Sequence, residues 1–213
     1  MTKIILATSS FYRQQAFRSL GLKFTARGSK LNEYFTDRPS SPKRLVLYLA
    51  KLKAETVAKN YHSGIVIGFD SVGWYKNQVF EKPKSRKEAF QRLKSLSGNN
   101  HQFYTGIYLK DLRTKKSISR VIITRVKMRK LTDSEINKYL DQDPKFNTYA
   151  LGYDPLGHYS STFIKEIDGS YNNLLKGIPL EAIIQMLIEI GYKLQDSYLK
   201  NYSMSSNSSI RGR

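Results

Sequence analysis

Short apolar runs alternate along the chain with longer segments that have helical periodicity. Residues 4–7 and 65–69 are almost continuously apolar, which is typical of strands buried on both faces. Leu45, Leu49 and Leu52 recur on one face of a segment that begins at Pro42, as expected for an amphipathic helix. The same patterns predict further strands at residues 79–83, 101–109, 119–128 and 163–167, and further helices at residues 10–20, 87–96, 132–140 and 180–190.

Because strands alternate with helices, the chain is predicted to be an α/β protein with a sheet of mixed direction. Residues 1–193 carry this alternation and are expected to form one unit. Residues 194–213 are rich in Ser and Asn and poor in apolar side chains. Such a segment cannot bury enough surface to offset its ordering entropy, so we expect a disordered tail that catalysis does not need.

Composition narrows the class of protein. The 213 residues include no cysteine, which excludes disulfides, thiolate zinc sites and cysteine nucleophiles, and fits a reducing compartment. No stretch approaches the roughly 18 apolar residues of a membrane-spanning helix. The apolar run at the start of the chain is too short for a signal peptide. A soluble, cytoplasmic protein without a membrane partner is therefore expected.

The charge of the chain is strongly unbalanced. With 36 Lys and Arg against 17 Asp and Glu, the formal net charge is +19, which attracts nucleic acids and phosphorylated metabolites. The alternative is a solvated basic surface without a specific partner. In residues 125–129, Arg-Val-Lys-Met-Arg, basic and apolar side chains alternate as in a strand with one solvent-facing side. No RRM, KH or helix-turn-helix pattern is present, so nucleic-acid binding is disfavoured.

Hydroxyl and basic side chains follow the first predicted strand. Ser9 and Ser10 stand where the next helix begins, and Arg13 comes one turn later. The free N–H groups of a helix N-terminus, together with an Arg, can bind an anion. The alternative is an ordinary serine cap.

Four other charged residues are candidates for chemistry. Asp70 directly follows the apolar run at residues 65–69, and α/β folds place catalytic groups at strand ends, although such Asp residues also cap loops. Lys53, Lys82 and the loop residue Glu33 are each indistinguishable from ordinary surface residues when taken singly.

Several common sites are disfavoured. The three histidines, at positions 62, 101 and 158, lack the spacing of metal ligands. The chain contains no G-x-x-x-x-G-K-[ST] and no G-x-S-x-G segment, which argues against a Walker-type ATPase and a serine hydrolase.

Taken together and in this order, the candidate segments resemble the Maf family of nucleoside triphosphate pyrophosphatases. The resemblance covers about residues 3–192 and is carried by Leu6-Ala-Thr-Ser-Ser with Arg13, Leu49-Ala-Lys-Leu-Lys-Ala54, Ile67-Gly-Phe-Asp70, Glu81-Lys-Pro83, Leu96-Ser-Gly98 with Tyr104-Thr-Gly106, and Gly169-Ser-Tyr with Gly177-Ile-Pro-Leu180. It implies an inosine-triphosphatase-like fold, in which a mixed, twisted sheet forms two lobes around a central cleft. It also implies cleavage between the α- and β-phosphates of a nucleoside triphosphate with a divalent cation, Mg²⁺ or Mn²⁺.

The resemblance also assigns roles to individual residues. Asp70 is implied to be the general base and Glu33 its acidic partner, and both are implied to hold the metal. The remaining residues are implied to bind phosphate, and they are Ser9, Ser10, Arg13, Lys53 and Lys82. Cations around a carboxylate lower its pKa, so Asp70 is expected to act chiefly by holding the metal and orienting water.

Base specificity is where the chain departs from the family pattern. The positions that separate the subgroups are occupied by Tyr12, Ser71 and Gly157, which match neither the dTTP/UTP subgroup nor the 7-methyl-GTP subgroup. An aromatic side chain at Tyr12 suits a cationic methylated base, so the 7-methyl-GTP subgroup is predicted. Asp154 is a candidate substitute for the acid missing at Gly157.

The sequence leaves open whether the chain is a full catalyst and whether it forms a homodimer. The altered loop around Gly157 also fits a catalytically weak, nucleotide-binding regulator of cell division, because the family has been linked to septum formation. The expected partner is a nucleoside triphosphate, and a homodimer is left open.

Overall fold

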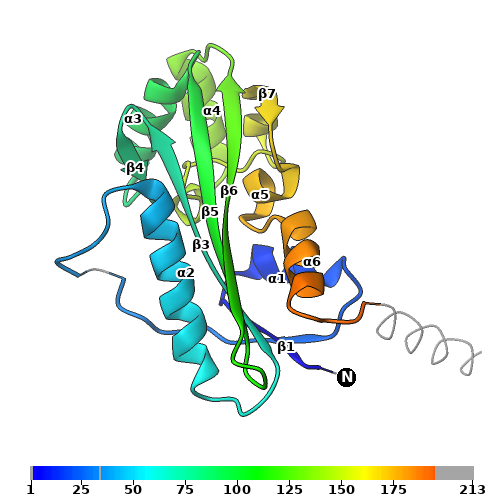
Figure 1. Cartoon of the computed structure of the whole chain (residues 1–213). Helices are drawn as coiled ribbons and strands as arrows, with labels where there is room; N and C mark the ends of the chain where they lie inside the picture. The colour runs from blue at the N-terminus through cyan, green and yellow to red at the C-terminus, as the bar shows by residue number, and fades with distance from the viewer. Residues whose placement is uncertain (1, 34, 195–213) are drawn as a thin grey trace, which may run out of the picture.

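The computed structural model describes residues 2–33 and 35–194, which form a seven-stranded sheet with helices on both faces (Figure 1). The strands are β1 (Ile4–Ala7), β2 (Phe24–Ala26), β3 (Ile65–Tyr75), β4 (Gln78–Phe80), β5 (Asn100–Asp111), β6 (Ser117–Met128) and β7 (Ile164–Asp168). Their order is β2-β1-β3-β5-β6-β7, and β4 pairs with β3. β1 runs parallel to β2 and β3, whereas the other pairs are antiparallel. This mixed sheet confirms the predicted fold class.

The helices begin where the sequence provides caps. Ser10 accepts a hydrogen bond from the Arg13 backbone N–H, and Thr132 with Glu135 forms a complete capping box. The helices are α1 (Phe11–Arg18), α2 (Pro42–Ala58), α3 (Arg86–Leu96), α4 (Asp133–Gln142), α5 (Tyr171–Lys176) and α6 (Leu180–Glu189), with two 3₁₀ turns, η1 (Phe146–Thr148) and η2 (Tyr159–Thr162).

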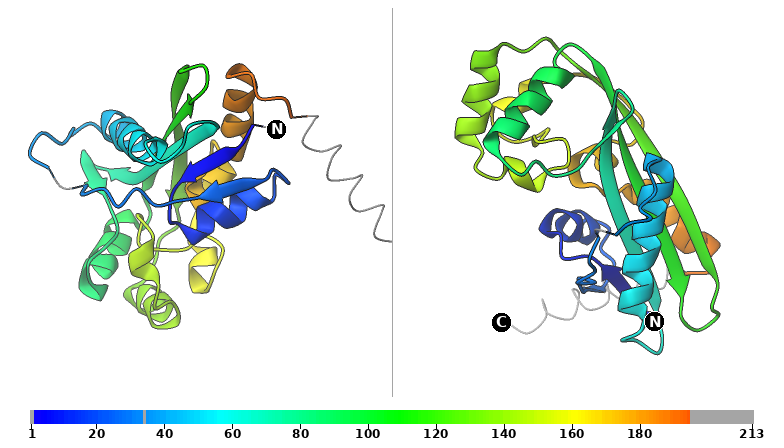
Figure 2. Two further views of the ribbon diagram at one scale, coloured as in Figure 1. Left: turned by 90° about the horizontal axis from the view of Figure 1, so that it is seen from below. Right: turned by 90° about the vertical axis from the view of Figure 1, so that its left-hand side faces the viewer.

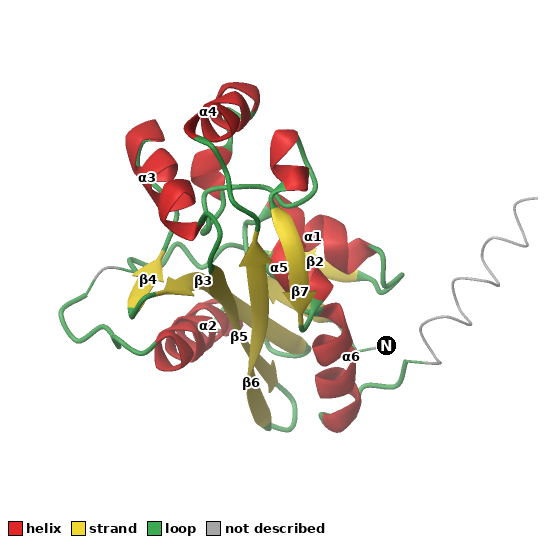
Figure 3. Ribbon diagram, turned by 90° about the horizontal axis from the view of Figure 1, so that it is seen from above, coloured by secondary structure: helices red, strands yellow, loops and turns green. Residues whose placement is uncertain are grey.

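The helices form two lobes, a lower one with α1, α2 and α6 and an upper one with α3 and α4, as oriented in Figure 1. In the lower lobe, α2 covers one face of the sheet, and α1 with α6 packs against the other (Figures 2 and 3). The upper lobe has its own apolar core, in which α3 and α4 pack with the far ends of β5 and β6. Because the lower and upper lobes have separate apolar cores, the chain has the predicted two-lobed shape. No helix in the described part of the chain is long and apolar enough to cross a membrane.

α2 lies unusually close to the sheet because two glycines face it. A Cβ atom at Gly68 would meet the Ala50 carbonyl oxygen and come within 2.9 Å of the Ala54 Cβ. A Cβ atom at Gly106 would lie 2.7 Å from the Leu47 backbone nitrogen. Real Cβ atoms do not make such short contacts, so only glycine allows α2 to lie directly on β3 and β5.

Three features differ from the sequence prediction. The strand expected to end at residue 69 continues to Tyr75 in β3, because it stays paired with β5 as far as Trp74. Asp70 was expected at the end of its own strand, but it lies inside β3. It follows the point at Gly68 where the neighbouring strand β1 ends. The short elements β2 and α5 were not predicted. The expected tail at 194–213 lies outside the described residues except for residue 194.

The predicted two-sided character of β6 is confirmed. Arg125 and Lys127 are exposed, whereas Val126 and Met128 are buried. The exposed arginine forms an ion pair with Asp168 on the neighbouring strand β7 at 3.1 Å. Part of the basic charge is thus balanced locally by acidic side chains, as expected for a solvated sheet face.

Candidate active site

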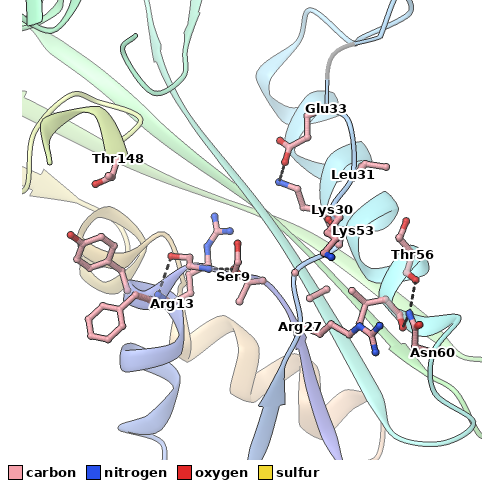
Figure 4. Close-up of a pocket in the computed structure, with 18 of the residues that line it drawn as sticks. Ser9, Arg13, Arg27, Lys30, Leu31, Glu33, Lys53, Thr56, Asn60 and Thr148 are labelled. Atoms are coloured by element: carbon pink, nitrogen blue, oxygen red, sulfur yellow. Dashed lines mark hydrogen bonds and ion pairs between the residues drawn. The ribbon is translucent and has the colours of Figure 1, made fainter. Parts of the chain in front are cut away.

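A cavity of about 950 Å³ opens beyond the end of β1. Its walls are the first turn of α1, the loop at residues 27–33, and one side of α2 (Figure 4). Lys82 and Thr148 contribute from the upper lobe. The cavity therefore lies between the two lobes, where the predicted cleft was expected.

The first turn of α1 forms one wall of this cavity. Ser9, Ser10 and Arg13 all line it. The Ser10 hydroxyl accepts from the Arg13 backbone N–H at 3.4 Å, and the Ser10 N–H donates to the Thr8 hydroxyl at 3.1 Å. The other N–H groups of the first turn and the helix dipole make this wall favourable for an anion.

Basic side chains dominate the cavity. Glu33 is the one acidic residue among the described residues that line it, against five basic ones: Arg13, Arg27, Lys30, Lys53 and Lys82. Lys82 makes no hydrogen bond or ion pair with the described residues, so its ammonium group is available to a ligand. Sequence reasoning missed Arg27 and Lys30, because their approach to the cavity depends on the unpredicted strand β2, which precedes them.

Lys53 links the two candidate catalytic carboxylates. Its Nζ atom lies 2.6 Å from Asp70 Oδ1 and 3.0 Å from Glu33 Oε1. The close packing of α2 at Gly68 places this lysine over the carboxylate two residues further along β3. Asp70 is 7% exposed and is not among the described residues that line the cavity, whereas Lys53, which contacts it, does line the cavity.

The electrostatics of Asp70 differ from the prediction. Burial raises the pKa of Asp70, while the adjacent Lys53 ammonium and the more distant Arg13 oppose that shift. The expectation that the pKa of Asp70 is lowered overall is wrong, because removing the carboxylate from water outweighs the lowering effect of the neighbouring cations.

The pair formed by Asp70 and Glu33 fits a divalent cation. In residues 2–33 and 35–194, no group of three His, Asp or Glu side chains is placed to hold a metal ion. Mg²⁺, however, is commonly held by only one or two carboxylates together with substrate phosphates. Both carboxylates already converge on the positive charge of Lys53, and hard oxygen donors are the ligands that Mg²⁺ and Mn²⁺ prefer.

The side chain of Arg13, on α1, links this helix to β3 and to the end of α5. Its Nε donates to the Gly177 carbonyl at 2.8 Å, Nη2 donates to the Ser71 hydroxyl at 2.7 Å, and Nη1 donates to the Phe69 carbonyl at 3.4 Å. Burial lowers the pKa of Arg13. Ser71 also shares a hydrogen bond of 2.7 Å with Thr105. The predicted specificity residue Ser71 is therefore held in place as a partner of Arg13.

A smaller pocket of about 140 Å³ shares a wall with the large cavity. Tyr12, Arg13, Lys82 and Thr148 line both spaces, and Ser71 lines the smaller one. We refer to it as the inner pocket. The inner pocket therefore adjoins the candidate phosphate site.

Tyr12 bridges the two lobes at the inner pocket. Its hydroxyl is 3.0 Å from the hydroxyl of Tyr149, and the two ring centroids are 5.6 Å apart. The Lys176 Nζ atom lies 5.3 Å from the centroid of the Tyr12 ring. Sequence reasoning missed Tyr149 and Lys176, since no local pattern connects either residue with Tyr12.

Gly157 and Asp154 are not among the described residues that line either space. The Asp154 carboxylate accepts from the Leu156 backbone N–H at 3.0 Å, and a Cβ atom at Gly157 would lie 3.0 Å from that same carboxylate. Both residues are thus engaged within their own loop. Pro155, which lies between them, lines the inner pocket instead.

Comparisons with known proteins agree on one family. Residues 3–190 match the family described as Maf-like protein. A dTTP/UTP pyrophosphatase of Clostridium botulinum strain 657 is 34% identical over 198 residues, covering 91% of this chain and 100% of the relative. A protein of the same name from Fusobacterium nucleatum is 34% identical over 191 residues, covering 90% and 97%. These names give no support to the predicted 7-methyl-GTP subgroup.

Two solved structures resemble the chain at low identity. The Ham1 protein of Staphylococcus aureus superposes with a TM-score of 0.48 at 15% identity, covering 88% of this chain and 98% of that chain. A nucleoside-triphosphatase, dITP/XTP pyrophosphatase, of Mycobacterium abscessus gives a TM-score of 0.41 at 10% identity, covering 86% and 94%.

Proposed function

The chain belongs to the Maf family, and from this premise we propose that it hydrolyses a nucleoside triphosphate to the monophosphate and pyrophosphate. The observation that most supports this proposal is the ring of basic side chains around one cavity, with two carboxylates joined by Lys53 at its edge. Such a site suits a highly anionic ligand and the chemistry of its phosphates.

Phosphate binding falls to the basic residues and to α1. Phosphoryl transfer needs little covalent help from a protein; it needs neutralised charge and a correctly placed water. Arg13, Lys53 and Lys82 reach the cavity from α1, α2 and the segment after β4, so they can surround a triphosphate from three sides. The hydroxyls and N–H groups at Ser9 and Ser10 would orient its oxygens.

Asp70 and Glu33 complete the proposed site. They would hold the divalent cation, which neutralises phosphate charge and lowers the pKa of bound water. Asp70 would also accept a proton from the attacking water. Lys53 contacts both carboxylates and also lines the cavity, so it can hold their orientation while facing the phosphates.

We propose dTTP and UTP as the preferred substrates. Two relatives that align over nine-tenths of the chain carry those substrates in their names. A cationic, methylated base such as 7-methyl-guanine would favour the aromatic face of Tyr12, but the Lys176 ammonium already lies against that ring. A cationic base would meet a like charge there.

One panel of reactions tests this proposal. The purified chain with Mg²⁺ or Mn²⁺ is incubated with dTTP, UTP, GTP and 7-methyl-GTP, and products are separated by chromatography. We expect monophosphate and pyrophosphate, no turnover with a chelator, and the highest kcat/KM for the pyrimidines. Formation of diphosphate and orthophosphate would contradict the proposed bond cleavage. Tight binding without turnover would favour the nucleotide-binding regulator.

A further inference from the structure

We propose that Lys176, acting together with Tyr12, selects the base of the substrate: it binds the ring carbonyl oxygens of an uncharged base and excludes a cationic one. The inference rests on the proposed function and adds a specificity residue to it. Lys176 stands at the end of α5, far in sequence from the other candidate site residues.

Lys176 is a cation without an anionic partner among the described residues. Its side chain lines the inner pocket and is half-buried, yet it forms no hydrogen bond or ion pair with the described residues. Its Nζ atom lies over the face of the Tyr12 ring, 5.3 Å from the centroid. A half-buried ammonium keeps unused donors, so it favours a ligand that brings acceptor oxygens.

The location of Lys176 argues that these oxygens belong to the base rather than to phosphate. The large cavity contains five basic residues, but Lys176 is not among its lining residues. The inner pocket shares Arg13 and Lys82 with the large cavity. Lys176 lines only the inner pocket, and so do the apolar residues Phe103, Leu151 and Leu174. At about 140 Å³ it is smaller than a typical site for a whole ligand, and it suits one ring.

The same lysine changes what Tyr12 can bind. An aromatic face attracts a cation through its quadrupole, and here the Lys176 ammonium already makes that contact. A second cation in the inner pocket would therefore gain little from the ring and would be repelled by Lys176. A carbonyl oxygen would instead accept a charge-assisted hydrogen bond.

Binding measurements with substrate analogues that resist hydrolysis test this assignment. We compare Lys176→Met with wild type, using α,β-methylene UTP, α,β-methylene 7-methyl-GTP and inorganic tripolyphosphate, which has no base. We expect about tenfold weaker binding of the UTP analogue, since a hydrogen bond to a charged group is lost. The 7-methyl-GTP analogue should bind about tenfold more tightly because a like charge is removed. Tripolyphosphate should bind equally well.

Two further variants serve as controls. Lys176→Arg keeps the charge and should keep the preference for the UTP analogue. Lys165→Met removes the same charge from an exposed position on β7, outside both pockets, so it reports how much net charge alone affects binding. Thermal unfolding of each variant checks that the fold is intact.

The outcomes separate this inference from the proposed function. Equal weakening of all three ligands would make Lys176 a phosphate ligand and overturn the inference, as would unchanged affinities. If the base preference shifts as expected but the wild-type chain releases no pyrophosphate, the inference is supported and the proposed reaction is refuted. Pyrophosphate release with no shift in preference would refute the inference alone.

Discussion

Gly68→Ala is expected to disturb the candidate active site through a single methyl group in the sheet. The added Cβ would meet the Ala50 carbonyl oxygen and the Ala54 side chain, both on α2. Backbone atoms cannot rotate away, so α2 must move off β3. The helix carries Lys53, whose Nζ is 2.6 Å from Asp70, and even a small shift of α2 lengthens that contact.

The free energy of unfolding should fall by about 1–3 kcal/mol, which is the cost of an extra methyl group in a tightly packed core. For a chain of this length, each kcal/mol lowers Tm by about 2–4 °C, so a fall of about 2–12 °C is expected. Activity should fall further than stability alone implies, because a displacement of about 1 Å at a catalytic group can cost about 100-fold. Differential scanning calorimetry and kcat/KM for dTTP measure the two effects.

Gly191→Ala is the matched control. No atom of the described residues lies within 4 Å of a Cβ at this position, but φ is +90°, so the substitution costs backbone strain far from the cavity. It should lower Tm by several degrees and leave kcat/KM unchanged. The reasoning would be refuted if Gly68→Ala kept kcat/KM within about twofold of wild type, since α2 would then not depend on that close contact.

Three other outcomes are expected. Asp70→Asn should lower kcat by about 100- to 1,000-fold with the fold intact by circular dichroism; near-wild-type pyrophosphate release would exclude Asp70 as the catalytic carboxylate. Arg13→Lys should lower the free energy of unfolding by about 2–3 kcal/mol in urea titrations, because a lysine cannot reproduce the forked bonds to Ser71 and Gly177; unchanged stability would contradict this. Burial lowers the pKa of His101 to about 4 from an unfolded value of 6.5. The contribution of His101 to the free energy of unfolding should therefore fall by about 3 kcal/mol as the pH drops from 6.5 to 4, because the unfolded chain binds the proton first. His101→Gln should remove that part of the pH dependence.

The regular elements could be predicted because their signals are local. The capping box of Thr132 and Glu135 and the proline that starts α2 each depend on residues within one or two turns. Strands such as β1 were visible as apolar runs. The elements β2 and α5 were missed because both are short, and β2 depends on pairing with β1 more than on its own pattern.

The candidate site was predictable in part. Asp70, Lys53 and Arg13 stand in segments whose order resembles a known family, and the structure brings them to one cavity edge. Their roles stay predictions. Gly157, predicted as a specificity position, lines neither the cavity nor the inner pocket, because the chain turns back on itself between Asp154 and Ser160.

What the sequence determined by itself is therefore most of the helices and strands, the fold class and the family, because hydrophobic period, caps and motif order are properties of neighbouring residues. Only the tertiary structure decided the raised pKa of Asp70, since desolvation depends on what packs around a carboxylate rather than on which charges are near it. Only the fold brought Lys176 against Tyr12, because contacts between distant segments are set by how sheet and helices pack.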